Sequence, residues 1–126
     1  METEIIEKYG RVINTLPEEV RILSPNDEII KIFPAAELTV GVTYENKHNG
    51  TLNMRVPLTK TIYKHTNLPP EEDGVFYIVS HMIFNVMKHI SPNRKDLLVV
   101  CETVKDLNGK HRGCRSLGWE TDYYKI

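Results

Sequence analysis

The stretch that decides the fold is VFYIVSHMIFNVMKHI, residues 75–90, because the spacing of its apolar residues changes partway along. The first five residues are an unbroken apolar run that is typical of a buried strand. The apolar side chains then recur at intervals of three and four, which is typical of a helix packed on one face. The hydroxyl of Ser80 can accept a hydrogen bond from a free N–H of the first turn. We therefore expect a strand over 75–79 and a helix from Ser80 to about Ile90, with Phe84 at the flank of its apolar face.

Outward from this stretch, alternating apolar residues and turn signals predict further strands. The expected strands cover residues 20–23, 28–33, 38–45, 54–58, 59–65 and 97–100, and a hairpin over 101–117 turns at Asn108-Gly109. Residues 46–53 are expected to form a polar loop with Asn49-Gly50 at its tip, and residues 2–9 a second, short helix. The 126 residues suit one domain, residues 1–126. The sequence predicts a mainly β, α+β domain, a small antiparallel sandwich or curled sheet carrying one or two helices.

The chain carries no signal for a membrane or for export. No apolar run approaches the ~20 residues that span a bilayer, and the acidic start lacks the basic-then-apolar pattern of a signal peptide. A symmetric turn at Asn108-Gly109 would pair Cys101 with Ser116 and Cys114 with Thr103, so the two thiols would be diagonal neighbours. We expect free thiols and a cytoplasmic protein, since cytosolic thiols stay reduced.

The net charge of −1 conceals an uneven distribution. Residues 86–115 contain seven Lys or Arg and three Asp or Glu, whereas residues 1–85 contain eight and twelve. A basic stretch of this kind favours a negatively charged partner, although a solvated basic edge is an equally simple explanation. It is too small for a protein that binds duplex DNA, which shows a broader basic surface.

Residues able to perform catalysis are not arranged in a known motif. The five histidines form no HExxH and the two cysteines no CxxC, so no metal site and no cofactor are predicted. Ser80 lacks a GxSxG elbow. Cys114 lies between Arg112 and Arg115, cations that could lower the pKa of a thiol. We expect a protein that is not an enzyme.

Phosphate binding fits the basic stretch better than catalysis. Arginine offers a planar fork that matches phosphate oxygens. In the expected structure Arg94 follows the helix, and Arg112 and Arg115 follow the tight turn. Asn93 can donate to and accept from a base or ribose edge. Phe84 could stack on a purine, or it could be an ordinary aromatic at the edge of the core.

Several segments resemble a family of small phage proteins, the first type of Thoeris anti-defence proteins. The resemblance lies in residues 12–17, 75–80, 93–98, 104–109 and 113–117. It implies a sponge that binds a cyclic ADP-ribose isomer made by bacterial TIR-domain enzymes, in the cytoplasm of the infected cell, without degrading it. It also implies dimers that can build into hexamers, with ligand near subunit boundaries, and in some members a separate site for cyclic oligonucleotides.

The resemblance also implies roles for individual residues. Phe84, or alternatively Phe76, would stack on the base and Asn93 would bond a base or ribose edge. Asp96 would contact a ribose hydroxyl or hold an arginine in place. Arg94, Arg112 and Arg115 would bind the phosphates. Arg55 of a partner chain could supply a further cation.

Three other functions stay open at this point. A small nucleotide phosphodiesterase or ribonuclease would use His81, His89 or His111 as acid and base. A protein-binding inhibitor would block a host enzyme through its surface. A purely structural phage protein would need no ligand.

Overall fold

The computed structural model describes residues 10–37 and 39–119, which contain eight strands and one helix. The strands are β1 Arg11–Asn14, β2 Val20–Leu23, β3 Ile29–Phe33, β4 Val42–Leu52, β5 Val56–Thr66, β6 Val75–Ile78, β7 Leu97–Lys105 and β8 His111–Gly118, and the helix is α1 His81–Ile90. The predicted mainly β, α+β fold is confirmed. The helix expected at residues 2–9 lies outside the described residues.

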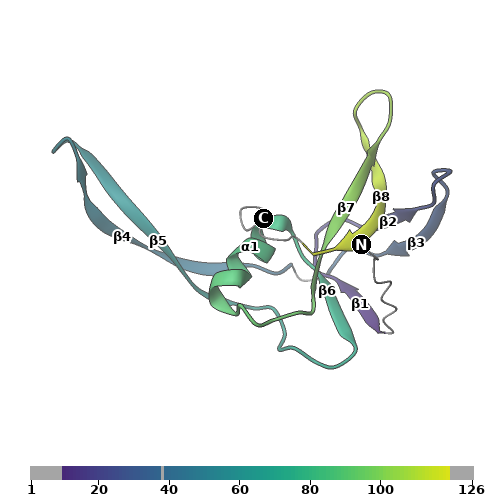
Figure 1. Ribbon diagram of the computed structural model, residues 1–126, viewed down its shortest axis with the longest axis horizontal. Coiled ribbons are helices and arrows are strands. Elements are labelled where there is room, and N and C mark those ends of the chain that lie inside the picture. Colours follow the sequence, from purple (N-terminus) through teal and green to yellow (C-terminus); the bar gives the residue numbers. More distant parts are fainter. Residues whose placement is uncertain (1–9, 38, 120–126) are drawn as a thin grey trace, which may run out of the picture.

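Six strands form one mixed sheet in the order β1-β6-β7-β8-β2-β3 (Figure 1). β6 runs parallel to both β1 and β7, and β2 runs parallel to β8, whereas β7–β8 and β2–β3 are antiparallel. The sequence had predicted antiparallel strands, whereas this sheet contains both parallel and antiparallel pairs. The reason is that β6, α1 and β7 form a β–α–β crossover, and a crossover through a helix returns the chain parallel to itself.

The helix begins where the sequence predicts. The Ser80 side chain accepts a hydrogen bond of 3.1 Å from the Ile83 N–H. Ile83, Val86 and Met87 are buried on the face turned to the sheet. Lys88 and His89 lie in the last turn, where cations interact favourably with the helix dipole.

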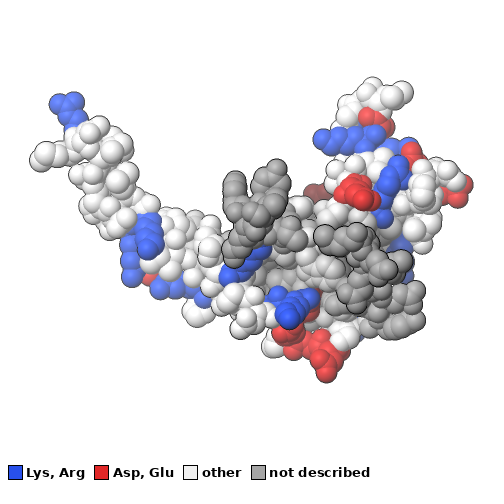
Figure 2. All heavy atoms as spheres, viewed as in Figure 1, with Lys and Arg blue, Asp and Glu red and all other residues white. Residues whose placement is uncertain are grey.

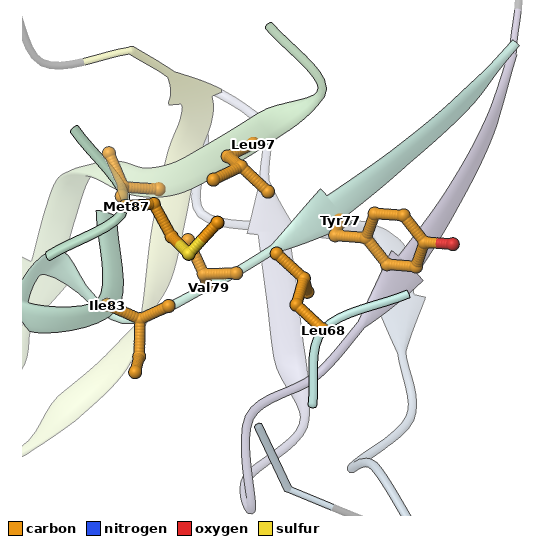
Figure 3. Close-up of a cluster of buried hydrophobic side chains, with 7 residues drawn as sticks. Leu68, Tyr77, Val79, Ile83, Met87 and Leu97 are labelled. Carbon is orange, nitrogen blue, oxygen red and sulfur yellow. The ribbon is translucent and has the colours of Figure 1, made fainter. Parts of the chain in front are cut away.

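The core lies on both faces of β6, because successive strand residues point to opposite sides. Tyr77 and Val79 belong to a cluster that includes α1, whereas Ile78 belongs to a second cluster with Val20 and Cys114. The first cluster is drawn in Figure 3 and comprises Leu68, Tyr77, Val79, Ile83, Met87, Leu97 and Val99. The unbroken apolar run at 75–79 is explained by this two-sided burial.

The hairpin of β7 and β8 has the predicted register. Cys101 pairs with Ser116 and Thr103 with Cys114, and neither cysteine is in a disulfide. The Asp106 carboxylate accepts hydrogen bonds of 2.9 Å from the N–H groups of Asn108 and Lys110, which closes the turn. Burial raises the pKa of the Cys114 thiol, so the lowering expected from its arginine neighbours does not prevail.

β4 and β5 form a separate two-stranded arm, residues 42–66, that extends away from the six-stranded sheet (Figure 1). The polar loop predicted at 46–53 is wrong, because β4 continues to Leu52 and the chain turns at Asn53-Met54. Asn49-Gly50 instead lies at a shift of register between His48 and Thr51, where an Asn-Gly signal marks a bulge. The two strands predicted at 54–58 and 59–65 are the single strand β5.

Candidate functional site

The aromatic residue predicted to stack on a base lies on α1. Phe84 is half-buried and packs against the first core cluster, so part of its side chain stays accessible at the edge of the core. The ammonium nitrogen of Lys88 lies 5.1 Å from the centre of its ring. Asn93 is exposed in the turn that follows the helix. An aromatic ring, a cation and an amide therefore lie on or just after one helix.

Arg94 and Asp96 form an ion pair in the segment between α1 and β7. Arg94 Nε donates to Asp96 Oδ1 at 2.7 Å and Nη2 donates to Oδ2 at 3.0 Å. Nη2 also donates to the Pro69 carbonyl, and the guanidinium lies 5.8 Å from the centre of the Tyr77 ring. The two side chains are only 9% and 5% exposed. Of the two roles predicted for Asp96, this geometry matches the one in which it holds an arginine.

Arg115 joins β8 to the turn between β2 and β3. Its Nη2 donates to Asp27 Oδ1 at 2.6 Å and its Nη1 donates to the Ser24 carbonyl. The pair is partly exposed, so water competes for both groups. Arg115 would have to leave Asp27 before it could bind a phosphate.

Arg112 is exposed and its guanidinium forms no ion pair with another described residue. It lines a hollow of about 230 Å³ with Glu18, Glu19 and Arg21. Arg21 Nε donates to Glu19 Oε1 at 2.6 Å, which partly offsets the acidic charge there. Among the three predicted arginines of the basic stretch, Arg112 is the one whose fork of donors is available.

The predicted site residues do not come together in one copy of the chain. Phe84 lies on α1 and Asn93, Arg94 and Asp96 lie between α1 and β7, while Arg112 and Arg115 lie on β8. The hollow that Arg112 lines includes none of the residues between α1 and β7. Phe76, the alternative aromatic, lies on β6 beside a different, acidic hollow.

A hollow that sequence reasoning missed contains two histidines. His81, at the start of α1, and His111, at the start of β8, both line a hollow of about 230 Å³ that also includes Val100 and Cys114. His81 Nε2 lies 3.3 Å from the Val100 carbonyl oxygen. The histidines are thirty residues apart on two elements, so no local motif could have signalled the pair.

A second missed hollow, of about 710 Å³, lies along β1. Phe33 and Tyr77 contribute aromatic surface to it, and Arg11 and Glu37 contribute opposite charges. The Asn14 amide in its wall is used within the fold, since it donates to the carbonyls of Glu18 and Pro34. Sequence reasoning overlooked this hollow because it did not predict β1.

Comparisons with known proteins identify no relative: no family model, no curated protein and no solved structure matches the chain. Within residues 10–37 and 39–119, no group of three or more His, Cys, Asp or Glu side chains could hold a metal ion. The helix in this part of the chain is too short to cross a membrane.

Proposed function

We propose that this protein binds and sequesters a cyclic ADP-ribose isomer produced by bacterial TIR-domain enzymes, without cleaving it, and so blocks the immune signal that the isomer carries. The observation that supports this proposal is that α1 and the turn after it carry Phe84, Lys88 and Asn93, a ring, a cation and an amide of the kinds that an adenine nucleotide needs. Sequestration requires affinity rather than an acid–base pair. A nanomolar sponge needs about −12 kcal/mol of binding free energy.

The proposal requires more than one copy of the chain. Arg112 is the available cation on β8, yet the hollow that it lines contains neither Phe84 nor Asn93. A homodimer, or a hexamer built from dimers, could close the β7–β8 hairpin of one copy over α1 of another. Such a preformed pocket would lower the cost of ordering the ligand, which is how small sites reach high affinity.

A small nucleotide phosphodiesterase is the second candidate, and one observation favours it. His81 and His111 line the same hollow, and Arg112 lines the adjoining one. Two histidines can serve as general acid and base, and an arginine can stabilise the charge on a phosphate in the transition state.

One experiment separates the two functions. The protein is incubated with the product of a TIR-domain enzyme, denatured by heat, and the supernatant is assayed for the signal. Signal that disappears on incubation and returns intact after heating supports a sponge. Signal that does not return indicates an enzyme. Signal that never disappears contradicts both functions and leaves a protein-binding inhibitor or a purely structural protein as the explanation.

A further inference from the structure

The arm, residues 42–66, exposes an unusual amount of apolar surface. Apart from Val42, Ile62 and Thr66, its strand residues are all exposed, and its exposed large apolar side chains are Tyr44, Leu52, Met54, Val56, Leu58 and Tyr63. A two-stranded hairpin is marginally stable by itself. Leu52 lies opposite Val56 at the end of the ladder, next to Met54 in the turn, so the tip of the arm is apolar. An exposed apolar surface of this kind marks a place that binds a partner.

The arm is also basic. Residues 42–66 contain four Lys or Arg and one acid, Glu45, which pairs with Lys64 at 3.6 Å. Lys47 lies directly opposite Lys60 in the ladder. Like charges in directly opposed positions destabilise a hairpin, so an anionic surface placed against this pair would stabilise the arm. Figure 2 shows Lys and Arg side chains at the tip of the arm and along it.

The rest of the same chain has the opposite charge. With a net charge of −1 for the whole chain and +3 for residues 42–66, the remainder carries −4. This charge favours a second copy of the chain as the partner of the arm. It disfavours a nucleic acid, which the remainder of the chain would repel.

The body, by which we mean the described residues outside the arm, has one surface that complements the tip of the arm. It carries the opposite charge and has apolar side chains in its wall. The consecutive exposed acids Glu71, Glu72 and Asp73 border a hollow of about 390 Å³ whose wall includes Val75 and Phe76. No ion pair of Glu72 or Asp73 with another described residue is present. At the tip of the arm, Met54 is 92% exposed and is followed by Arg55.

Two other charged residues line the same hollow. Asp96 is neutralised by Arg94, and Lys95 contributes one positive charge. The backbone N–H of Lys95 donates to Glu71 Oε2 at 3.2 Å. The hollow therefore keeps an excess of negative charge, and it is this excess that an arginine would meet.

We propose that the arm docks on the body of a second copy, with Met54 and Arg55 entering the hollow beside Glu71–Asp73. Strands of eleven residues reach roughly 35 Å at about 3.3 Å per residue. Each copy offers one arm and one hollow, so a reciprocal exchange closes a two-fold dimer. Arg55 then pairs with acids of the partner copy and is not a ligand cation.

Charge reversal tests this contact. The variants are Arg55→Glu, Glu72→Lys with Asp73→Lys, and the combination of all three, with Lys31→Glu on the exposed strand β3 as the matched control. Self-association is measured by sedimentation equilibrium without nucleotide, so the result does not depend on the proposed sponge function. Circular dichroism confirms that each variant is folded.

We expect the wild-type chain and Lys31→Glu to dimerise alike. Arg55→Glu and the double acid reversal should each weaken the dimer by about tenfold or more, and the triple variant should recover most of the loss. Added salt should weaken the wild-type dimer. A monomeric wild type, an acid reversal without effect, or a triple variant no better than the single reversals would each overturn the proposal.

Discussion

Asp96 accepts two hydrogen bonds from Arg94, of 2.7 and 3.0 Å, and the two residues are only two positions apart in the chain. The pair is almost fully buried and Arg94 also reaches the Pro69 carbonyl and the Tyr77 ring. Its contribution is therefore mainly to the fold.

Removing one member of this pair should destabilise the protein strongly. Arg94→Ala leaves the Asp96 carboxylate buried without its partner, which costs about 3–5 kcal/mol. Arg94→Met combined with Asp96→Leu should recover much of that loss. The control is Arg21→Ala, which breaks an exposed pair with Glu19 and should cost about 0–1 kcal/mol. Urea unfolding measures all of them, and equal losses for Arg94→Ala and Arg21→Ala would contradict the prediction.

Arg112 should matter for ligand binding and not for stability. Its side chain is exposed and forms no ion pair with another described residue, so Arg112→Ala should leave the melting temperature nearly unchanged. Calorimetry with the TIR product should show an affinity about tenfold lower, the scale of one charge-assisted hydrogen bond. Lys110→Ala, two residues away in the turn, is the control. An unaltered affinity would remove Arg112 from the site.

The choice between Phe84 and Phe76 can be made with matched substitutions. Phe84→Leu keeps an apolar side chain against the core but removes the flat ring, and stacking on a base is worth about 1–3 kcal/mol. We expect the affinity for the cyclic nucleotide to fall about tenfold or more, while Phe76→Leu changes it little. The reverse result would move the stacking site to β6.

Gly113 should tolerate no side chain, because β8 passes very close to β2 at this point. A Cβ at Gly113 would lie 2.8 Å from the Arg21 carbonyl oxygen, so Gly113→Ala must push the two strands apart at a cost of about 1–3 kcal/mol. Gly41→Ala is the control, since nothing lies within 4 Å of a Cβ there. Thermal unfolding compares the two, and similar melting temperatures would contradict the prediction.

The two thiols should differ in reactivity. Burial raises the pKa of Cys114, so it stays protonated to a higher pH than an ordinary thiol. Because the folded pKa lies above the unfolded value of about 8.5, this contribution to stability is complete below that value and is lost as the pH rises through the folded pKa. Iodoacetamide at pH 8, read by mass spectrometry, should modify Cys101 before Cys114. Faster modification of Cys114 would show that the arginines beside it prevail.

The parts of the fold that the sequence predicts well are those with local signals. Ser80 marks the start of α1 and Asn108-Gly109 marks the β7–β8 turn, and both are where they were expected. β1 was missed because it is only four residues long and is held by parallel pairing with β6, a partner more than sixty residues away. The arm was divided wrongly because Asn49-Gly50, usually a turn, lies within a bulged strand.

The candidate site was harder to predict than the fold. The residue types were chosen for their chemistry, but whether a guanidinium is available depends on what lies beside it. Arg115 is paired with Asp27, which is 88 residues away in the sequence, and no sequence pattern indicates that contact. The Arg94–Asp96 pair, in contrast, joins residues only two positions apart, and the sequence offered it as one of two roles for Asp96.

The regular pairing of β4 with β5 between Tyr44 and His48 allows the length of the arm to change. Lys47 and His48 face Lys60 and Thr59, so deleting these four residues removes two rungs of the ladder while every remaining side chain keeps its face. Each such deletion would shorten the arm by about 7 Å. The distance between the tip of the arm and the six-stranded sheet can therefore change in fixed steps, and the core of the domain does not have to change with it.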